Sequence, residues 1–247
     1  GIDFFSTVDF KENIQLLEKL GCYSIKIGSA DVNHFPLIRQ AAKTGMCIQL
    51  DTGMATLGDI EKAVDVVRSE GNENIIIHHC PSGYPARLDS INLRIINTLK
   101  NMFSYPVAFS DHTPGNEMDI AAVVLGANMV EKTITEDRMT PSVEHIMSIE
   151  PKEMKNFVRT IRELEKALGS RRRIMQNDEL IKRNLLRRSA FLVEPAKKGQ
   201  CLEDCKVEFR RPGLGIHADQ FELLKNNVFV KDIESGQMIQ FSDLLWK

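Results

Sequence analysis

One short segment of the sequence combines a cation with a hydroxyl side chain, the combination that binds phosphate. Lys26-Ile27-Gly28-Ser29 places an ammonium group three residues before a hydroxyl, and Thr7 adds a hydroxyl at the end of the preceding apolar run. A phosphate group is bound by a point charge together with short hydrogen-bond donors. Lysine is almost never fully buried unless it is paired, so a lysine inside an apolar run suggests a function. We therefore interpret Lys26, Ser29 and Thr7 as candidate anion-binding residues.

Two further segments carry imidazole groups beside apolar runs. His78-His79-Cys80-Pro81-Ser82-Gly83-Tyr84-Pro85 follows one run, and Phe109-Ser110-Asp111-His112-Thr113 belongs to another. Successive side chains of a strand alternate between its faces, so the two adjacent histidines should point in opposite directions. Histidine is the commonest metal ligand. Asp111 either pairs with a charge or caps the next helix, and Tyr84 offers a hydroxyl to a sugar.

The last apolar run of the first part of the chain ends in Glu131-Lys132-Thr133. Alternation places the glutamate and the threonine on one face and the lysine on the other. Ser142-Val143-Glu144-His145 follows in a loop. This loop either extends over the site or presents an exposed charged pair.

These polar groups stand at the ends of six apolar runs that alternate with amphipathic helical stretches. This rhythm predicts successive βαβ units and a parallel sheet, and hence an α/β fold. Polar residues follow every run, so residues from the ends of all strands could form one site. This arrangement favours a (β/α)8 TIM barrel over an open doubly wound sheet, in which the site lies at a single switch point. Eight strands close such a barrel, so two units would lie upstream of Gly1. The expected strands are 4–6, 24–28, 47–51, 74–79, 107–110 and 129–134, and the expected helices are 10–20, 35–44, 57–70 (preceded by Thr56), 91–102 (preceded by Ser90), 116–125 and 151–168.

The second part of the chain has a different sequence pattern, with short apolar runs and frequent turns in place of long helical stretches. Gly169-Ser170 ends the long helix, Arg171-Arg172-Arg173 follows, and beyond Arg188 short runs are separated by turns. We predict a barrel domain over residues 1–170, a linker over 171–187 and a small domain over 188–247. The arginine triplet is interpreted as a solvated linker, because no aromatic or basic stripe accompanies it.

Composition excludes several classes of protein. The 247 residues are 43% hydrophobic and 27% charged, which is typical of a globular protein. A formal net charge of −2 gives no field that attracts nucleic acid or anionic membranes, and no apolar run reaches the ~20 residues that span a bilayer. Five cysteines without CxxC spacing predict reduced thiols. We expect a cytoplasmic protein with no nucleic-acid or membrane partner.

Together these motifs resemble those of the N-acetylneuraminate (sialic acid) synthase family. The resemblance implies a TIM barrel with a C-terminal antifreeze-like (SAF) domain. It also implies condensation of phosphoenolpyruvate with an N-acyl mannosamine-type sugar to a nine-carbon 2-keto-3-deoxy acid, with release of phosphate. The matching segments are Ser6-Thr7, residues 26–29, Asp51-Thr52-Gly53-Met54, His79-Cys80 with Tyr84-Pro85, residues 110–113 and Glu131-Lys132; in the small domain they are Arg188-Ser189, Lys198-Gly199, residues 211–216 and residues 233–236.

The resemblance assigns roles to individual residues. A divalent metal, typically manganese, would be bound by His112, and Arg211 would come from the partner subunit of a domain-swapped homodimer. The implied catalytic residues are Lys26, His112 and Glu131; the phosphoenolpyruvate-binding residues are Thr7, Lys26, Ser29, Asp51, Ser82 and Ser110; the sugar-binding residues are Tyr84, Glu144 and Arg211.

Departures from the family pattern leave alternatives open. Thr133 stands where the family has its second metal-binding histidine, and threonine is a poor replacement for imidazole; Asp51, His79 or His145 would have to compensate. Asp51 replaces a serine near the phosphate, and a carboxylate there costs energy unless a cation lies between. The early glutamate and lysine of the family have no counterpart here. The alternative is a non-catalytic or metal-independent sugar- or phosphate-binding homologue, and the acceptor sugar is not indicated.

Overall fold

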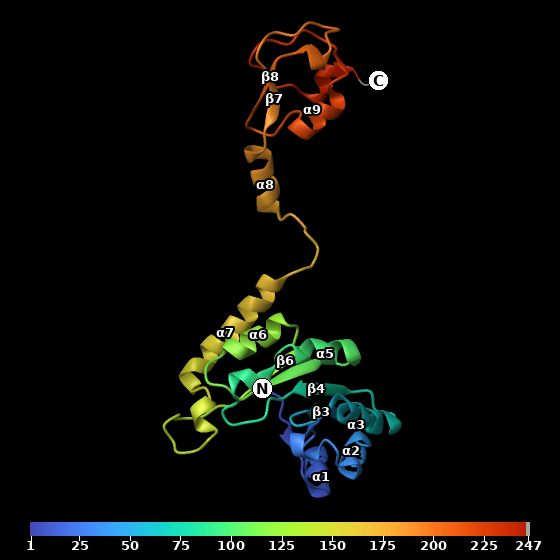
Figure 1. The fold of residues 1–247 in the computed structure, drawn as a ribbon, viewed down its shortest axis with the longest axis vertical. Coiled ribbons are helices and arrows are strands. Elements are labelled where there is room, and N and C mark those ends of the chain that lie inside the picture. Colours follow the sequence, from blue (N-terminus) through green and yellow to red (C-terminus); the bar gives the residue numbers. More distant parts are fainter. Residues whose placement is uncertain (246–247) are drawn as a thin grey trace. The chain divides into compact units, whose positions relative to one another are not determined.

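A computed structural model describes residues 1–245 (Figure 1). The chain forms two compact units, Gly1–Gly169 and a second unit that begins at Ser170. Each unit has a hydrophobic core of its own, and they are described separately below.

The first unit is an α/β structure built on one six-stranded parallel sheet, with its strands in sequence order. A consecutive order has no point at which the strand order reverses, which agrees with the predicted TIM-barrel-like arrangement rather than with a doubly wound sheet. Strands β1 and β6 are the first and last in this order. The strands are β1 (Ser6–Thr7), β2 (Ser24–Ile27), β3 (Cys47–Asp51), β4 (Ile75–His79), β5 (Val107–Asp111) and β6 (Met129–Lys132).

Helices follow the strands as the sequence predicts. Thr56 caps α3, because its hydroxyl accepts the Asp59 amide proton while the Asp59 carboxylate accepts from the Thr56 amide. The predicted cap at Ser90 is wrong: Ser90 lies inside the short helix α4 (Leu88–Ile91), and the residue that follows this helix, Asn92, adopts the left-handed conformation. The helices are α1 (Lys11–Lys19), α2 (Phe35–Ala42), α3 (Leu57–Ser69), α4 (Leu88–Ile91), α5 (Ile95–Met102), α6 (Glu117–Val124) and α7 (Pro151–Leu168).

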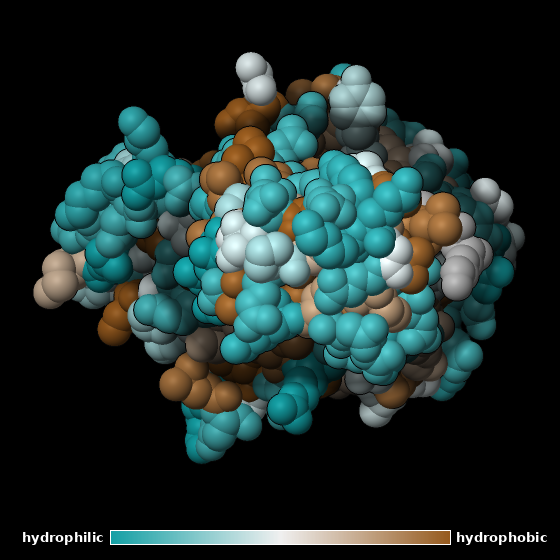
Figure 2. Space-filling view, turned by 90° about the horizontal axis from the view of Figure 1, so that it is seen from above, coloured by the Kyte–Doolittle hydropathy of each residue, from teal (hydrophilic) through white to brown (hydrophobic). Residues whose placement is uncertain are grey.

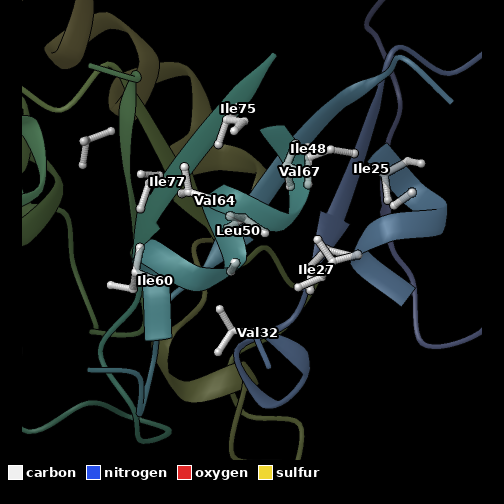
Figure 3. Close-up of a cluster of buried hydrophobic side chains, with 14 of the residues drawn as sticks. Ile25, Ile27, Val32, Ile48, Leu50, Ile60, Val64, Val67, Ile75 and Ile77 are labelled. Atoms are coloured by element: carbon white, nitrogen blue, oxygen red, sulfur yellow. The ribbon is translucent and has the colours of Figure 1, made fainter. Parts of the chain in front are cut away.

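The two faces of the sheet differ in polarity, and this difference positions the site. Ile25 of β2 is paired in register with Ile48 of β3, and Ile48 with Ile75 of β4. Figure 3 shows these isoleucines beside Val64 and Val67 of α3, and all are almost completely buried. The intervening side chains of the same strands point to the opposite face. Lys26, Gln49, Asp51 and His78 alternate in this way, so the face away from the helices is polar.

The second unit contains α8 (Asn177–Leu186), α9 (Ala218–Leu224) and two short antiparallel pairs. The pairs are β7 (Ser189–Leu192) with β8 (Val207–Arg210), and β9 (Val228–Phe229) with β10 (Leu244–Leu245). The predicted linker over 171–187 therefore contains a helix. Leu192, Leu202 and Phe229 belong to the core of this unit, and each is at most 1% exposed.

The surface agrees with the composition. Hydrophilic side chains predominate on the face shown in Figure 2, and hydrophobic residues are scattered among them. Among residues 1–245, no helix is both long enough and apolar enough to cross a membrane.

Candidate active site

One cavity of about 450 Å³ in the first unit is lined by residues at the carboxyl ends of the strands. This is the edge at which the strand-end polar residues were expected to converge. Eight predicted site residues line it, together with Thr133, which stands at the position of the expected metal-binding histidine; the eight are Thr7, Lys26, Ser29, Asp51, Tyr84, His112, Glu131 and Glu144. The cavity is therefore the candidate active site.

Three predicted site residues have other positions. Ser110 is buried beneath the cavity and donates a hydrogen bond to Glu131 Oε1 at 2.9 Å. Ser82 is exposed and lines a neighbouring hollow with Thr52 and His79. Arg211 belongs to the second unit, where its Nε donates to the carbonyl oxygen of Leu186 at 2.9 Å.

Lys26 is the centre of the site. Its side chain is 9% exposed, and its Nζ lies 2.6 Å from Glu131 Oε1 and 3.0 Å from Asp51 Oδ2. Burial lowers the pKa of Lys26, but the two carboxylates outweigh burial and raise the pKa above its ordinary value. Lys26 is therefore a permanent cation, and the paired carboxylates explain how a lysine is buried here.

The two carboxylates that share Lys26 differ in acidity. Burial raises the pKa of Asp51 to about 6, against the opposing effect of Lys26. Burial is the largest effect on the pKa of Glu131 and acts to raise it, but Lys26, His78 and the hydrogen bond from Ser110 together bring this pKa below its ordinary value. Glu131 is thus ionised in the folded protein at neutral pH. As the pH falls from neutral, Asp51 is the first of the two carboxylates to take up a proton.

A chain of buried polar groups supports Asp51 from behind. His78 is completely buried; its Nε2 lies 2.8 Å from Gln49 Oε1, and Gln49 Nε2 donates to Ser24 Oγ at 2.7 Å. Its Nδ1 faces Asp51 Oδ1 at 3.5 Å. Burial lowers the pKa of His78 to about 4, so the imidazole is neutral. Gln49 was not predicted from the sequence, where its only signal is an amide inside an otherwise apolar strand.

The two adjacent histidines point to opposite faces, as strand alternation predicts. His79 Nε2 hydrogen-bonds to the carbonyl oxygen of Ile91 at 2.6 Å, on the helix side of the sheet, whereas His78 belongs to the polar face. His112 Nδ1 contacts the carbonyl oxygen of Pro81 at 3.0 Å, and its ring stacks on Tyr84 with centroids 4.5 Å apart. Burial lowers the pKa of His112, so the Tyr84–His112 pair forms an uncharged wall of the cavity.

Ser29 fixes the loop after β3. Its hydroxyl accepts the amide proton of Gly53 at 3.0 Å. A Cβ atom at Gly53 would lie 2.8 Å from Ser29 Oγ and 3.0 Å from the carbonyl oxygen of Cys80. Only glycine permits this close approach. Burial raises the pKa of the nearby Cys80 thiol, and hydrogen bonds from the Ser29 and Ser110 hydroxyls act to lower it.

A second ionic cluster lies on the opposite face of β5 and β6. Lys132 Nζ lies 2.5 Å from Asp111 Oδ2 and 3.6 Å from Asp119 Oδ2, and both carboxylates are fully buried. Asp111 therefore pairs with a charge and does not cap the next helix. Burial and the neighbouring Asp111 raise the pKa of Asp119 to about 8, so Asp119 is protonated at neutral pH. Asp119 was not predicted from the sequence.

The donor set does not fit a metal ion held by protein ligands. Residues 1–245 contain no group of three or more His, Cys, Asp or Glu side chains placed to bind a metal. Asp51 is paired with Lys26, His79 with Ile91, and His145 Nδ1 with Thr135 Oγ1 at 2.6 Å, so each proposed substitute for Thr133 has another partner. The Thr133 hydroxyl is buried without a hydrogen-bond partner. His112 alone would remain as an imidazole ligand.

The fold and the cavity define a TIM-barrel-like α/β protein with a buried, ion-paired lysine in a cavity at the carboxyl ends of its strands. The profile described as NeuB family matches residues 1–173. The chain therefore belongs to the NeuB family, which confirms the resemblance for the first unit.

Relatives of known name share most of the chain. It is 34% identical to the N,N'-diacetyllegionaminic acid synthase of Campylobacter jejuni subsp. jejuni serotype O:2, over 97% of this chain and 72% of that protein. The crystal structure of the spore coat polysaccharide biosynthesis protein SpsE of Bacillus subtilis is similar over 100% of this chain and 74% of that chain, with 32% identity and a TM-score of 0.65. The N-acetylneuraminic acid synthetase of Leptospira borgpetersenii serovar Hardjo-bovis, in complex with citrate, matches 75% of this chain and 66% of that chain, with 34% identity and a TM-score of 0.68.

Proposed function

We propose that the protein is a sugar-acid synthase that condenses phosphoenolpyruvate with an N-acyl mannosamine-type sugar. The observation that carries this proposal is the convergence of Lys26, Ser29, Tyr84, His112 and Glu131 on one cavity in a chain of the NeuB family. Two of the similar proteins are named as synthases of N,N'-diacetyllegionaminic acid and of N-acetylneuraminic acid. We propose a nine-carbon 2-keto-3-deoxy acid as the product here.

The proposed reaction forms one carbon–carbon bond and replaces the bond between C2 and the phosphate oxygen with a bond between C2 and an oxygen from water. C3 of phosphoenolpyruvate attacks the aldehyde carbon of the open-chain sugar, whose oxygen takes up a proton. Water then adds to the oxocarbenium carbon C2 and loses a proton. The tetrahedral product expels phosphate and becomes the 2-keto acid, so that no oxidant or reductant is needed.

The residues of the cavity supply binding and orientation in this scheme. Lys26 binds an anionic group of phosphoenolpyruvate, with hydroxyl donors from Ser29 and Thr7. Ser110 holds Glu131 in place at 2.9 Å, and Tyr84 and Glu144 line the side of the cavity at which we place the sugar. Ser82 is exposed in a loop. We therefore propose that Ser82 contacts phosphoenolpyruvate only if this loop moves toward the cavity when substrate binds.

The predicted manganese ion stays a prediction. His112 would be its imidazole ligand, and a bound divalent cation would polarise the sugar carbonyl as a Lewis acid. The donor set described above does not complete such a site, and no step proposed here depends on it. Chelation of divalent cations in the assay below tests the prediction directly.

We also propose that the second unit is an antifreeze-like (SAF) domain and that the protein is a domain-swapped homodimer. Arg211 would then contact the N-acyl group of sugar in the partner's cavity. Among the described residues no carboxylate pairs with Arg211, and its Nε is held by Leu186. A planar guanidinium with unused donors suits an amide carbonyl.

The proposed function is tested by phosphate release from phosphoenolpyruvate in the presence of N-acetylmannosamine or of bacillosamine-derived 6-deoxy sugars. We expect phosphate and a nine-carbon 2-keto-3-deoxy acid, detected by mass, in equal amounts with one of these acceptors. Thr133 favours a second candidate, a homologue that binds phosphoenolpyruvate or sugar without turnover. Tight binding with no product from any acceptor would establish that candidate instead.

A further inference from the structure

The anion site at Lys26 has more negative than positive charge when its carboxyl groups are ionised. One ammonium group is shared by Asp51 and Glu131, at 3.0 and 2.6 Å. Two carboxylates and one cation give a local charge of −1 in a buried site. A phosphate or carboxylate group that approaches Lys26 is therefore repelled more than it is attracted, unless one carboxylate is neutralised.

The structure provides a place for a neutralising proton. Asp51 Oδ1 and His78 Nδ1 lie 3.5 Å apart, and both atoms are buried without a hydrogen-bond partner. Gln49 Nε2 donates to Ser24 Oγ, which directs Gln49 Oε1 at His78 Nε2. The imidazole therefore carries its proton on Nε2 and presents the Nδ1 lone pair to Asp51. Two acceptors face each other, and one proton on Asp51 Oδ1 satisfies both atoms.

The groups around Asp51 assign the proton to this carboxyl. Lys26 faces it from β2, His78 from β4 and Glu131 from β6, and Cys80 and Tyr84 face it from the loop after β4. Within residues 1–245, Lys26 is the only cation that faces Asp51. Glu131 has the shorter contact with Lys26 and also accepts from Ser110, so Glu131 keeps its charge. The direction of the pKa of Asp51, raised by burial, supports the same assignment.

We infer that an anion binds at Lys26 together with one proton. Asp51 takes up this proton and keeps it, and the protonated carboxyl donates a hydrogen bond to His78 Nδ1. The ligand class is a phosphate ester or a carboxylate, and Asp51 with His78 acts as a positioning pair that sets the charge of the site. Proton uptake changes the local charge from −1 to zero without moving Lys26. This inference rests on the proposed function, because the anion is the one placed at Lys26 there.

The test is calorimetric titration with sulfate, a dianion that does not itself titrate between pH 5 and 9. Repeating the titration at pH 7.5 in buffers of different ionisation enthalpy gives the number of protons taken up. We expect about one proton per sulfate at pH 7.5, with affinity falling about tenfold for each pH unit above the pKa of Asp51. Below that pKa the uptake should vanish, because Asp51 is already protonated.

Asp51→Asn identifies the group that takes up the proton. The amide has the shape of a protonated carboxyl and can donate to His78 Nδ1, so we expect sulfate affinity at pH 8 to rise on the order of ten- to hundredfold and to lose its pH dependence. Asp31→Asn is the matched control, since Asp31 lines the same cavity without an ion pair among the described residues. This control should keep both the proton uptake and the pH slope.

The outcomes separate the inference from the proposed function. Sulfate binding without proton uptake in the unmodified protein overturns the inference and leaves the proposed function standing, as does an unchanged pH slope in Asp51→Asn. If neither protein binds sulfate at any pH, the anion site itself is wrong, and the proposed function falls with it. The proton count of the unmodified protein decides the inference even if the variant does not fold.

Discussion

Lys26 acts through its charge, and its neighbours determine how much of that charge a ligand meets. The Lys26 side chain is 9% exposed, and its ammonium group lies between Asp51 and Glu131. If Lys26 is replaced by a neutral residue, the two carboxylates stay buried without their cation. Their desolvation then destabilises the folded state. A variant of Lys26 must therefore be judged by its folding as well as by its ligand binding.

Lys26→Met keeps the length of the side chain and removes its charge. Because charge-assisted hydrogen bonds contribute about 1.5–3 kcal/mol, phosphoenolpyruvate should bind roughly ten- to hundredfold more weakly. Isothermal titration measures the dissociation constant, and thermal unfolding verifies that the variant is folded. Lys43→Met is the matched control, because Lys43 is 61% exposed and outside the cavity. Equal affinity in the two folded variants would contradict the anion-binding role of Lys26.

The sequence predicted the residues at strand ends better than those inside strands. Lys26, Asp51 and Glu131 were recognised because charged groups that end apolar runs of parallel strands must meet at one edge. Gln49 escaped because one polar residue within a strand does not reveal its partners, and here these come from β2 and β4. Asp119 escaped because its partner Lys132 lies on a different element, and sequence spacing carries no information about such a contact.

Elements β5, β6 and α6 are joined by the buried cluster of Asp111, Lys132 and Asp119. Asp119 has a pKa of about 8 in the folded protein, raised by burial and by Asp111, against 3.8 as its ordinary value. The folded state therefore holds a proton that the unfolded state releases between these pH values. The stability that this proton provides is fully present below pH 4 and is lost as the pH rises to about 8.

Asp119→Asn should remove this pH dependence. Relative to the unmodified protein, its free energy of unfolding should increase with pH from 5 to 8, by at most about 1.4 kcal/mol per pH unit. Denaturant unfolding monitored by circular dichroism at several pH values measures the difference. Asp65→Asn, on the exposed side of α3, should give a small difference that does not vary with pH. Parallel stability curves for the unmodified protein and Asp119→Asn would show that Asp119 is ionised throughout.

Periodicity predicted the elements well and their ends less well. The ends of all six strands were predicted to within two residues, and the bounds of β3 and α7 were correct, because alternation and the 3.6-residue period come directly from burial of one face. The helix expected over 91–102 is instead divided into α4 and α5. Asn92 adopts a left-handed conformation between them, and asparagine in a sequence does not reveal which of its allowed conformations tertiary packing selects.

At the scale of the whole molecule, the two units pose the question of which site the second unit serves. The sequence pattern changes near residue 170, and the chain divides into two units at Gly169. It did not predict α8 within the supposed linker, because that stretch is polar and none of its residues is buried. The local sequence pattern does not indicate which cavity the second unit contacts, because such a pattern reports burial within an element and not contacts between separate units. An experiment can identify that cavity.

Subunit mixing tests the proposed domain-swapped homodimer. His112→Ala alters the barrel cavity and Arg211→Ala alters the second unit, and each should be inactive as a pure protein. In a two-fold symmetric dimer with shared sites, a mixed dimer contains one site with both defects and one intact site. An equal mixture should therefore recover about a quarter of the unmodified activity after subunit exchange, since about half of the dimers are mixed.

The recovery depends on where the second unit acts. If Arg211 served the cavity of its own chain, every site in a mixed dimer would carry one defect, and mixing would restore nothing. If Arg211 had no contact with substrate, Arg211→Ala would already be active before mixing. Analytical ultracentrifugation at the assay concentration provides the control, because a fully active monomer excludes the shared site regardless of the mixing result. Recovery near a quarter, in a protein that sediments as a dimer, is the outcome expected only when the guanidinium of one subunit completes the cavity of the other.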